Sequence, residues 1–509
     1  MAARPSPHEP RLPPVYRTAE IRSLEKQHAG DDLMERAGEA AASVATAMLA
    51  DRPGRVVVLA GPGNNGGDGF VLARLLRAAF HDVVVVFLGD AARLPSDASR
   101  AHAAFIAAGG ATQPEPPASS PALIVDALFG LGFDRTLPEA HAHWVRWANA
   151  QASPTLSLDI PTGLRADTGI ATAPAIRADA TATFIGLKPG LLTAEGPDLC
   201  GTISVHGLGL DAPSSSAGQG HLLEWAAVAT RLPEAFARHV NAVHKGTFGT
   251  LGVIGGRSGM LGAVLLAGRA ALRCGAGKVR VGFVADDVPG VDPLTPELML
   301  TTATQVLDAG ADVWVVGCGM GAEDAAREAL RRTLDDKGAL VIDADALNVL
   351  ADDATLRRAV RSRNGATIVT PHPAEAARLL RSTVAAVQRD RLAAAESIAH
   401  ELRAHVVLKG AGTVIAHPDG RFDINGSGNP GLAFAGSGDV LAGMIGACLA
   451  QNADPVAAAR IGVCLHGAAA DALVARGDGP IGIRGAELAD AARDLLNRAA
   501  ATPRERRLG

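Results

Sequence analysis

The chain has 509 residues, which is long for a single hydrophobic core, so we expect two domains. Apolar residues make up 48% and aromatic residues only 3%, so the cores must rest on small aliphatic side chains and the 58 glycines, which suits buried parallel strands joined by glycine turns. The formal net charge of −5 without a basic run argues against nucleic-acid binding, and five scattered cysteines without a C-x-x-C pair argue against a disulfide framework or a zinc site and fit a reducing cytoplasm.

Residues 1–15 contain prolines and charges but lack the apolar core of a signal peptide, so we expect a disordered lead-in. No unbroken run of about 18 apolar residues follows anywhere in the chain, and we therefore expect a cytoplasmic protein without a membrane span.

The first domain is predicted over residues 16–210. A helical pattern covers 18–49, and it is followed by a strand at 55–60, a glycine-rich loop, a helix at about 70–80 and a strand at 83–88. Strand, loop, helix and strand of these lengths form a parallel, right-handed unit. Later strands end at Asp126 and Asp159. This order predicts an α/β fold, a doubly wound Rossmann-like sandwich.

Residues 211–220 are rich in Ser, Gly and Pro and are the predicted linker. A second α/β domain is predicted over residues 221–509. Its two closing helices are expected at about 454–476 and 484–499, after a short hairpin at 414–424. The predicted strands lie near 250–255, 278–284, 313–317, 339–343, 367–370 and 406–409.

The loop at residues 61–69 reads GPGNNGGDG and contains G-x-G-x-x-G between a strand and a helix, which is the context that this motif requires. Its glycines allow a close backbone approach, and Asn64 and Asn65 add side-chain hydrogen bonds. A tight turn for packing alone does not need five glycines in nine residues. The loop therefore predicts a phosphate- or nucleotide-binding site.

Asp126 and Asp159 both end predicted parallel strands, at the edge of the sheet where ligands bind. Each alone is readily explained as a turn residue. Together, beside a phosphate loop, they would repel the ligand unless a cation intervenes or one of them takes a proton. Oxygens of Asn65, Asp126 and Thr162 would suit a hard cation, and Asp159 would then be available for acid/base chemistry.

In the second domain, residues 436–439 (GSGD) run directly into an apolar helix, so bare backbone N–H groups form an anion hole at the helix start. Asp439 either caps this helix or is a general base facing a hydroxyl beside the transferred phosphate. His372 lies between prolines at a strand end, which favours a binding role over a packed core histidine. Lys409 and Gly410 either hold a nucleotide phosphate or turn a hairpin. No Walker A, H-E-x-x-H or G-x-S-x-G motif is present.

These motifs resemble the family of bifunctional NAD(P)H-hydrate repair enzymes, an epimerase domain fused to a nucleotide-dependent dehydratase with a ribokinase-like fold. The resemblance covers almost all of residues 16–496. In the first domain it rests on residues 33–38 (LMERAG), 64–69 (NNGGDG), 125–130 (VDALFG) and 159–163 (DIPTG). In the second it rests on residues 244–246 (HKG), 342–348 (IDADALN), 370–373 (TPHP) and 436–443 (GSGDVLAG).

The resemblance implies that the first domain interconverts the R and S hydrates of NADH and NADPH. Asp159 would be the acid/base residue, Lys188 its helper, and potassium would lie at Asn65, Asp126 and Thr162. The implied substrate contacts are Asn64, Asn65, Gly66, Gly67 and Asp68, the loop of Gly130, Leu131, Gly132, Phe133, Asp134, Arg135 and Thr136, and Asp159 itself.

For the second domain, the resemblance implies dehydration of the S hydrate with Mg²⁺ and ADP, giving AMP and phosphate. Asp439 would deprotonate the ring hydroxyl, which decides between its two interpretations. The hydrate would contact Asp439, Ala263, Gly319 and His372. The nucleotide would contact Lys409, Gly410, Ala411, Gly412, Thr413 and Gly438. Homo-oligomers are common in the family, so we expect one here.

Five positions depart from the family pattern, in loops rather than at the proposed catalytic side chains. Leu131 replaces a usual Thr, Cys318 a usual Pro, Ala374 a usual Gly, and residues 434–435 a usual Thr-Gly. Two alternatives compete with the repair enzyme. A ribokinase-like small-molecule kinase, fused to a dinucleotide-binding module, would also use the GSGD turn. Alternatively, one half of the chain, most readily the first, would be only a nucleotide-binding or interaction module.

Overall fold

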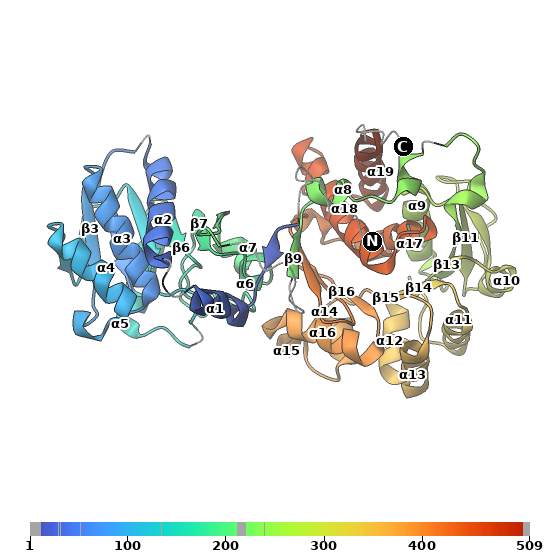
Figure 1. Cartoon of the computed structure of the whole chain (residues 1–509). Helices are drawn as coiled ribbons and strands as arrows, with labels where there is room; N and C mark the ends of the chain where they lie inside the picture. Colours follow the sequence, from blue (N-terminus) through green and yellow to red (C-terminus); the bar gives the residue numbers. More distant parts are fainter. Residues whose placement is uncertain are drawn as a thin grey trace. The chain divides into compact units, whose positions relative to one another are not determined.

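The computed structural model describes residues 12–28, 30, 32–50, 52–133, 135–210, 220–238 and 240–501. This part of the chain divides into two compact units, one over residues 14–210 and the other over residues 220–501 with residues 12–13 (Figure 1). Most of the predicted lead-in and linker lies outside the described residues. Where they are described, Pro14–Val15 form strand β1 with Val15 fully buried, and Gly220 begins strand β9.

The first unit is built on a sheet whose paired strands are all parallel, in the order β4-β3-β2-β5-β6-β7-β8. The order reverses between β2 and β5, so the loops that follow these two strands open a crevice at the carboxyl edge. The strands are Val56–Ala60 (β2), Val83–Phe87 (β3), Thr112–Gln113 (β4), Leu123–Ala127 (β5), Thr155–Leu158 (β6), Ala180–Phe184 (β7) and Thr202–His206 (β8).

Helices cover both faces of this sheet, as the prediction of a doubly wound sandwich required. Helices α2, α3 and α4 pack together on one face, and α5 covers the other face with the buried Trp144 and Val145 (Figure 1). The bounds of the helices are Thr18–Gln27 (α1), Leu33–Leu49 (α2), Asn64–Ala78 (α3), Ser96–Ala107 (α4), Glu139–Asn149 (α5), Pro189–Leu192 (α6) and Gly196–Leu199 (α7).

Two local predictions in this unit were wrong. The helix expected over residues 18–49 is two helices, because the chain turns after α1 and Asp32 adopts a left-handed backbone with φ of 51°. The helix expected from residue 70 begins at Asn64, so most of the glycine-rich motif is its first turns rather than a loop before it. Asn64 to Asp68 therefore lie on a rigid element.

The second unit has a larger sheet, in the order β9-β18-β17-β16-β15-β14-β13-β10-β11-β12 from β9 onward. Its pairs are parallel except where β17 runs antiparallel to β16 and β18, the predicted hairpin. Strands β9 and β12 were not predicted. The strands are Gly220–Leu223 (β9), Thr250–Gly255 (β10), Lys278–Phe283 (β11), Met299–Thr302 (β12), Val313–Val316 (β13), Ala339–Ile342 (β14), Thr367–Val369 (β15), His405–Leu408 (β16), Val414–Ala416 (β17) and Phe422–Asn425 (β18).

Two groups of helices sandwich this sheet, with α9, α17, α18 and α19 on one side and α10 to α16 on the other (Figure 1). Helix α8 packs against α18. Their bounds are Trp225–Ala229 (α8), Leu261–Arg273 (α9), Ala303–Ala309 (α10), Asp324–Asp335 (α11), Asp345–Asp352 (α12), Ala354–Ser362 (α13), Pro373–Leu379 (α14), Val384–Arg389 (α15), Arg391–Leu402 (α16), Ser437–Ala450 (α17), Pro455–Ala475 (α18) and Gly485–Ala501 (α19).

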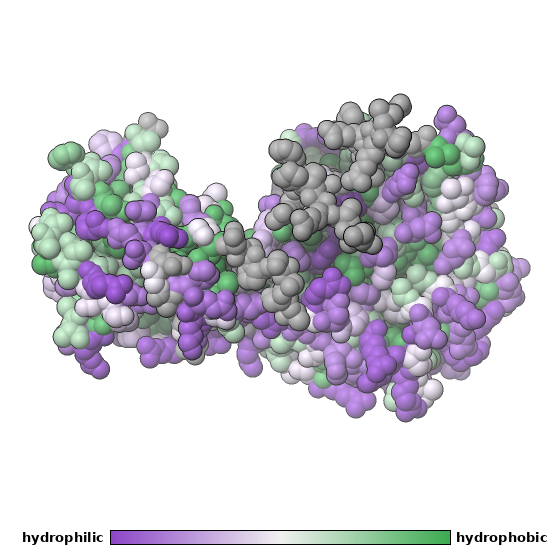
Figure 2. Space-filling model, viewed as in Figure 1, coloured by the Kyte–Doolittle hydropathy of each residue, from purple (hydrophilic) through white to green (hydrophobic). Residues whose placement is uncertain are grey.

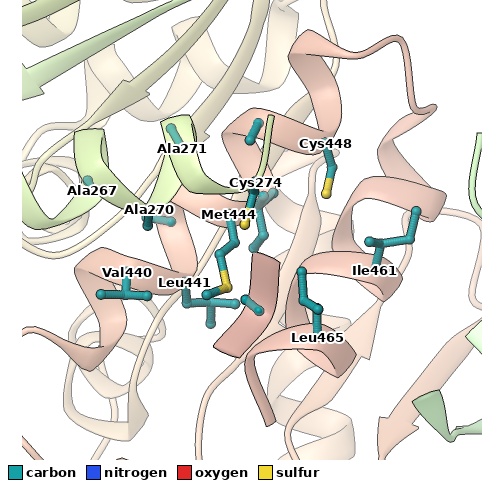
Figure 3. Close-up of a cluster of buried hydrophobic side chains, with 14 of the residues drawn as sticks. Ala267, Ala270, Ala271, Cys274, Val440, Leu441, Met444, Cys448, Ile461 and Leu465 are labelled. Atoms are coloured by element: carbon teal, nitrogen blue, oxygen red, sulfur yellow. The ribbon is translucent and has the colours of Figure 1, made fainter. Parts of the chain in front are cut away.

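The core of the second unit holds α17 in place through small residues. A Cβ added at Gly443 would lie 2.1 Å from the carbonyl oxygen of Ala267, so the backbones of α17 and α9 are in direct contact. Met444 and Cys448 of α17 project toward Cys274, Ile461 and Leu465 in the same buried cluster (Figure 3). This packing fixes the position of the first turn of α17, which carries Asp439.

Helix α18 has the length and apolar composition of a membrane-spanning helix, the one such helix among the described residues. However, 67% of its apolar window is buried inside the second unit, where it packs against α8, α17 and α19. It is a core helix by that burial.

Candidate functional sites

The first site lies at the point where the strand order of the first sheet reverses. Asn65, in the first turn of α3, is buried, and neither its amide nitrogen nor its amide oxygen has a hydrogen-bond partner among the described residues. A Cβ added at Gly130 would lie 3.2 Å from both Asn65 Oδ1 and Asp159 Oδ2. Asn65, Gly130 and Asp159 therefore meet across the crevice, and a buried amide without a partner normally indicates a missing ligand or water.

Asp126, at the end of β5, is fully buried and receives several hydrogen bonds. Its carboxylate accepts from the Thr162 backbone N–H at 2.8 Å, the Thr162 hydroxyl at 2.7 Å and the Ser157 hydroxyl at 2.9 Å. Burial raises the pKa of Asp126 above its usual value, and the bonds from Thr162 and Ser157 oppose that rise. Asp126 and Thr162 thus form one rigid group of oxygens beside the crevice.

Asp159 follows β6 in a left-handed backbone conformation with φ of 64° and is paired with a buried lysine. The Nζ of Lys188 donates to Asp159 Oδ1 at 2.5 Å, to the Thr183 hydroxyl at 2.8 Å and to the Phe184 carbonyl at 2.8 Å. Three acceptors match the three protons of an ammonium group, so Lys188 is held immobile. The other Asp159 oxygen accepts from the Leu131 backbone N–H at 3.2 Å and faces Gly130.

Asp68 and Glu25 are two further carboxyl groups close to this pair. Burial raises the pKa of Asp68 well above its usual range, and the charges of Asp159 and Glu25 raise it further, while Lys188 opposes the rise. Burial also raises the pKa of Glu25, with the charge of Asp159 as the next cause, although Glu25 is an exposed residue. Glu25 was missed by the sequence reasoning, because it lies on α1, outside every motif.

The loop predicted to bind the hydrate divides into three parts. Leu131 and Gly132 lie near the crevice, with a Cβ at Gly132 placed 3.2 Å from the Arg22 guanidinium. Phe133 is buried in the core and packs against Phe129. Arg135 and Thr136 are exposed, and Asp134 lies outside the described residues.

The second site lies where α17 begins. Gly436, with φ of 99°, is the N-cap of this helix, so Asp439 is not its N-cap residue. A carboxylate oxygen of Asp439, a carboxylate oxygen of Asp343 and the Cys318 sulfur all lie within 4.8 Å of one another. Burial raises the pKa of Asp439 to about 7, and Asp343 adds to the rise, while a hydrogen bond from the Cys318 thiol and the charge of Lys409 oppose it. Asp439 is thus a carboxylate suited to accept a proton near neutral pH.

Lys409 lies between Asp343 and the start of α17. Its Nζ is 2.6 Å from Asp343 Oδ1 and 3.9 Å from Glu375 Oε2, and a Cβ added at Gly438 would lie 3.2 Å from it. Burial would lower the pKa of Lys409, but the Asp343 and Glu375 carboxylates outweigh that effect and raise it. The hydroxyl of Thr370 donates to Asp343 at 2.7 Å. Asp343 was not among the predicted site residues, although its motif was noted.

His372 is the N-cap of α14. Its Nδ1 accepts from the backbone N–H groups of Ala374 and Glu375 at 3.1 and 3.2 Å, so the proton of the neutral ring is on Nε2, 3.2 Å from Glu375 Oε1. Burial lowers the pKa of His372 and raises the pKa of Glu375 to about 7. The ring is nearly half exposed, so Nε2 is also accessible to a ligand.

The glycines after β16 form an open turn over a buried arginine. A Cβ at Gly410 would lie 2.8 Å from the guanidinium of Arg391, which is itself buried and donates to the Leu408 carbonyl at 3.2 Å. Burial lowers the pKa of Arg391 to about 10. Gly410 and Ala411 are exposed, and Gly412 and Thr413 are half-buried. Arg391 was missed because the helix that carries it has no motif.

Ala263 and Gly319 lie side by side, on α9 and in the loop after β13. A Cβ added at Gly319 would be 3.0 Å from that of Ala263. Gly319 directly follows Cys318, so this contact places both residues beside the Asp439 carboxylate. Residues predicted from four separate loops therefore meet around one cluster at the carboxyl edge of the second sheet.

Comparison with known proteins gives a consistent result for each unit. The family model described as YjeF-related protein N-terminus matches residues 30–190, and the one described as NAD(P)H-hydrate dehydratase matches residues 251–490. A bifunctional NAD(P)H-hydrate repair enzyme of Escherichia coli is 41% identical over 87% of this chain and 85% of its own length. A bifunctional NAD(P)H-hydrate repair enzyme of Coxiella burnetii is 37% identical over 95% of this chain and 99% of its own length. An ADP-dependent (S)-NAD(P)H-hydrate dehydratase of Neisseria meningitidis is 48% identical over 53% of this chain and 92% of its own length.

Proposed function

The chain belongs to the family of bifunctional NAD(P)H-hydrate repair enzymes, and we propose which of its side chains carry out the two reactions. The family predicted from the motifs is confirmed, and the two units are α/β folds, the first of them a doubly wound parallel sheet. The protein is an isomerase and a lyase, which epimerises hydrated NADH and NADPH and dehydrates the S hydrate with a nucleotide.

In the first unit, Asp159 is proposed as the residue that takes a proton from the hydrate and returns it. The observation that supports this role is its pairing with Lys188, because the immobile ammonium stabilises the carboxylate and leaves Oδ2 facing the crevice. The hydrate is proposed to lie between the first turn of α3, residues 64–68, and the loop of residues 130–136. Lys188 touches Asp159 rather than the crevice, so we assign it as a positioning residue.

Potassium is proposed at Asn65, Asp126 and Thr162. The donor set fits a hard cation, because Asn65 Oδ1 is buried without a partner among the described residues and the Asp126 carboxylate lies at the neighbouring strand end. When bound, the cation would supply positive charge to the phosphate-binding side of the crevice. The residues that hold it would also fix the start of α3.

In the second unit, Asp439 is proposed to remove the proton from the ring hydroxyl of the S hydrate. The hydroxyl oxygen then attacks the terminal phosphorus of ADP, the bond to the bridging oxygen breaks, and AMP leaves. Expulsion of phosphate from the ring carbon, together with loss of a proton from the neighbouring ring carbon, re-forms the ring double bond and restores the reduced nicotinamide. Backbone N–H groups of residues 436–438 are proposed to stabilise the transferred phosphate, and Mg²⁺ would supply charge to the phosphates when bound.

The ligands of this unit are proposed to approach Asp439 from two sides. The turn of Lys409, Gly410, Ala411, Gly412 and Thr413 binds ADP together with Gly438. Ala263, Gly319 and His372 contact the hydrate. This arrangement is supported by the short distances that join Lys409 to Gly438 and Ala263 to Gly319.

A cytoplasmic location and a homo-oligomer remain proposals. The five cysteines are free and buried, which agrees with a reducing compartment. Light scattering on the purified protein would measure the oligomeric state.

The proposed roles are tested with a mixture of both hydrate epimers, ADP, Mg²⁺ and K⁺, while the absorbance of reduced nicotinamide is followed. The wild-type protein should recover nearly all of the cofactor. Asp159→Asn should stop when the S hydrate is consumed, and Asp439→Asn should recover none but still equilibrate the epimers. Full recovery by Asp159→Asn, or dehydration by Asp439→Asn at the wild-type rate, would refute the assignment of that residue.

A further inference from the structure

A cavity of about 310 Å³ lies in the second unit, and it is lined by four arginines and one glutamate. Arg357, Arg358 and Arg361 come from α13, Arg381 follows α14, and Glu401 is near the end of α16. Helices α13 and α14 both pack against α16. None of these residues belongs to the sites described above.

The positive charge of this cavity is only partly neutralised. Glu401 is ion-paired with Arg357, and Arg358 donates to the Thr355 hydroxyl at 3.1 Å. Among the described residues, Arg357 is the one cavity arginine that is ion-paired, and Arg361 and Arg381 make no ion pair with a carboxylate. Four guanidinium groups thus face a single carboxylate, in a protein whose formal net charge is −5. The cavity is therefore a local positive centre rather than part of a basic surface.

Arg357 supplies a second, independent observation. Its side chain is only 11% exposed, and its Nη1 is buried without a hydrogen-bond partner among the described residues. A buried guanidinium nitrogen without an acceptor is costly, and an anion in the cavity would remove that cost. Arginines three and four residues apart on one helix also repel one another, which a bound anion would relieve.

The walls indicate the size and chemistry of the ligand. Leu379, Leu380 and Leu402 line the cavity beside the arginines, so one side is apolar. A volume of about 310 Å³ matches the lower range of small-molecule sites. Arginine forks bind phosphate oxygens in pairs of hydrogen bonds. Strongly hydrophilic residues cover the region of α13 on the surface (Figure 2).

We propose that this arginine cavity is a binding site for a small phosphorylated metabolite, separate from the nucleotide site at Asp439. Arg361 and Arg381 would bind the phosphate oxygens first, because they are exposed and carry unneutralised charge. The buried Arg357 nitrogen would take a further oxygen, and the leucine wall would contact the organic part.

Calorimetric titration of the full-length protein with inorganic pyrophosphate tests this proposal. Wild type is compared with Arg361→Gln/Arg381→Gln and with Arg389→Gln, a matched control on the exposed end of α15. We expect pyrophosphate to bind the double variant at least tenfold more weakly than wild type or the control. All three proteins should have the same KM for ADP and the same unfolding midpoint without ligand.

Two results would overturn the proposal. One is equal pyrophosphate affinity in wild type and the double variant, because the ligand would then occupy only the nucleotide site. The other is no binding to wild type at millimolar concentration. Because the KM for ADP is measured in parallel, failure of this site is distinguishable from failure of the proposed nucleotide site.

Discussion

Lowering the pH should slow the dehydratase reaction through protonation of Asp439. Burial and the neighbouring Asp343 raise the pKa of this carboxyl to about 7, and only its ionised form accepts a proton. At pH 6, one unit below that value, about one tenth of the molecules carry the base form. The rate with saturating ADP should therefore fall about tenfold from its plateau, and about tenfold more for each further unit.

The assay is the initial rise of reduced-nicotinamide absorbance from the pure S hydrate, measured from pH 9 to pH 5. Glu375 must be separated from Asp439, since burial raises the pKa of Glu375 to about 7 as well. In Glu375→Gln the acidic decline should persist with a midpoint near pH 7. Epimerisation, measured on the same samples, provides the internal control for loss of folded protein.

Two outcomes would refute this reasoning about Asp439. A midpoint near pH 4 in the wild-type protein would mean that the base is a carboxyl in water. Disappearance of the decline in Glu375→Gln would mean that the titrating group is Glu375. Either result would require the hydroxyl to be deprotonated by a different group.

Three further predictions concern single residues. Cys318→Ala removes the thiol hydrogen bond that lowers the pKa of Asp439. In a pH–rate profile, the acidic decline of the dehydration rate should therefore move to higher pH, and the rate at pH 7 should fall about twofold to threefold. Lys188→Met removes the ammonium group that is paired with the Asp159 carboxylate. The kcat of epimerisation should fall at least about a hundredfold while the rate of dehydration is unchanged, and an unaltered kcat of epimerisation would contradict the positioning role. Arg460→Met removes two hydrogen bonds from the buried Asp423 and should destabilise the second unit by about 3–5 kcal/mol in urea unfolding. Burial alone would raise the pKa of Asp423, but hydrogen bonds from His221, His417 and Arg460 outweigh burial and lower it. The wild-type stabilisation should therefore be present at neutral pH and lost in acid, and a variant equally stable at pH 7 would disprove the account.

Much of the fold could be predicted because its signals are local. Valine-rich runs that end in glycine turns identify buried parallel strands wherever they pack, and the strands β2 and β3 followed that rule. The order of motifs predicted the family, which the comparisons confirmed. The break between α1 and α2 was not predicted, since a left-handed residue such as Asp32 leaves no clear pattern in the sequence.

Site residues could be proposed from the sequence only where they stand in short recognisable motifs. Asp159 follows a predicted strand in DIPTG and Asp439 ends the GSGD motif, so both are expected at the carboxyl edge of a sheet, where ligands bind. Glu25 and Arg391 lie on helices without a motif, and no sequence pattern connects them to the loops they approach.

The sequence by itself determined the two α/β domains, the family and the kinds of side chain available for chemistry. Only the tertiary structure decided which charges meet: Lys188 with Asp159, Lys409 with Asp343, and the Cys318 thiol with Asp439. The physical reason is that strand order and helix packing bring together residues far apart in the chain. Protonation at the sites then depends on burial and on distances of a few ångströms, which exist only once the chain has folded.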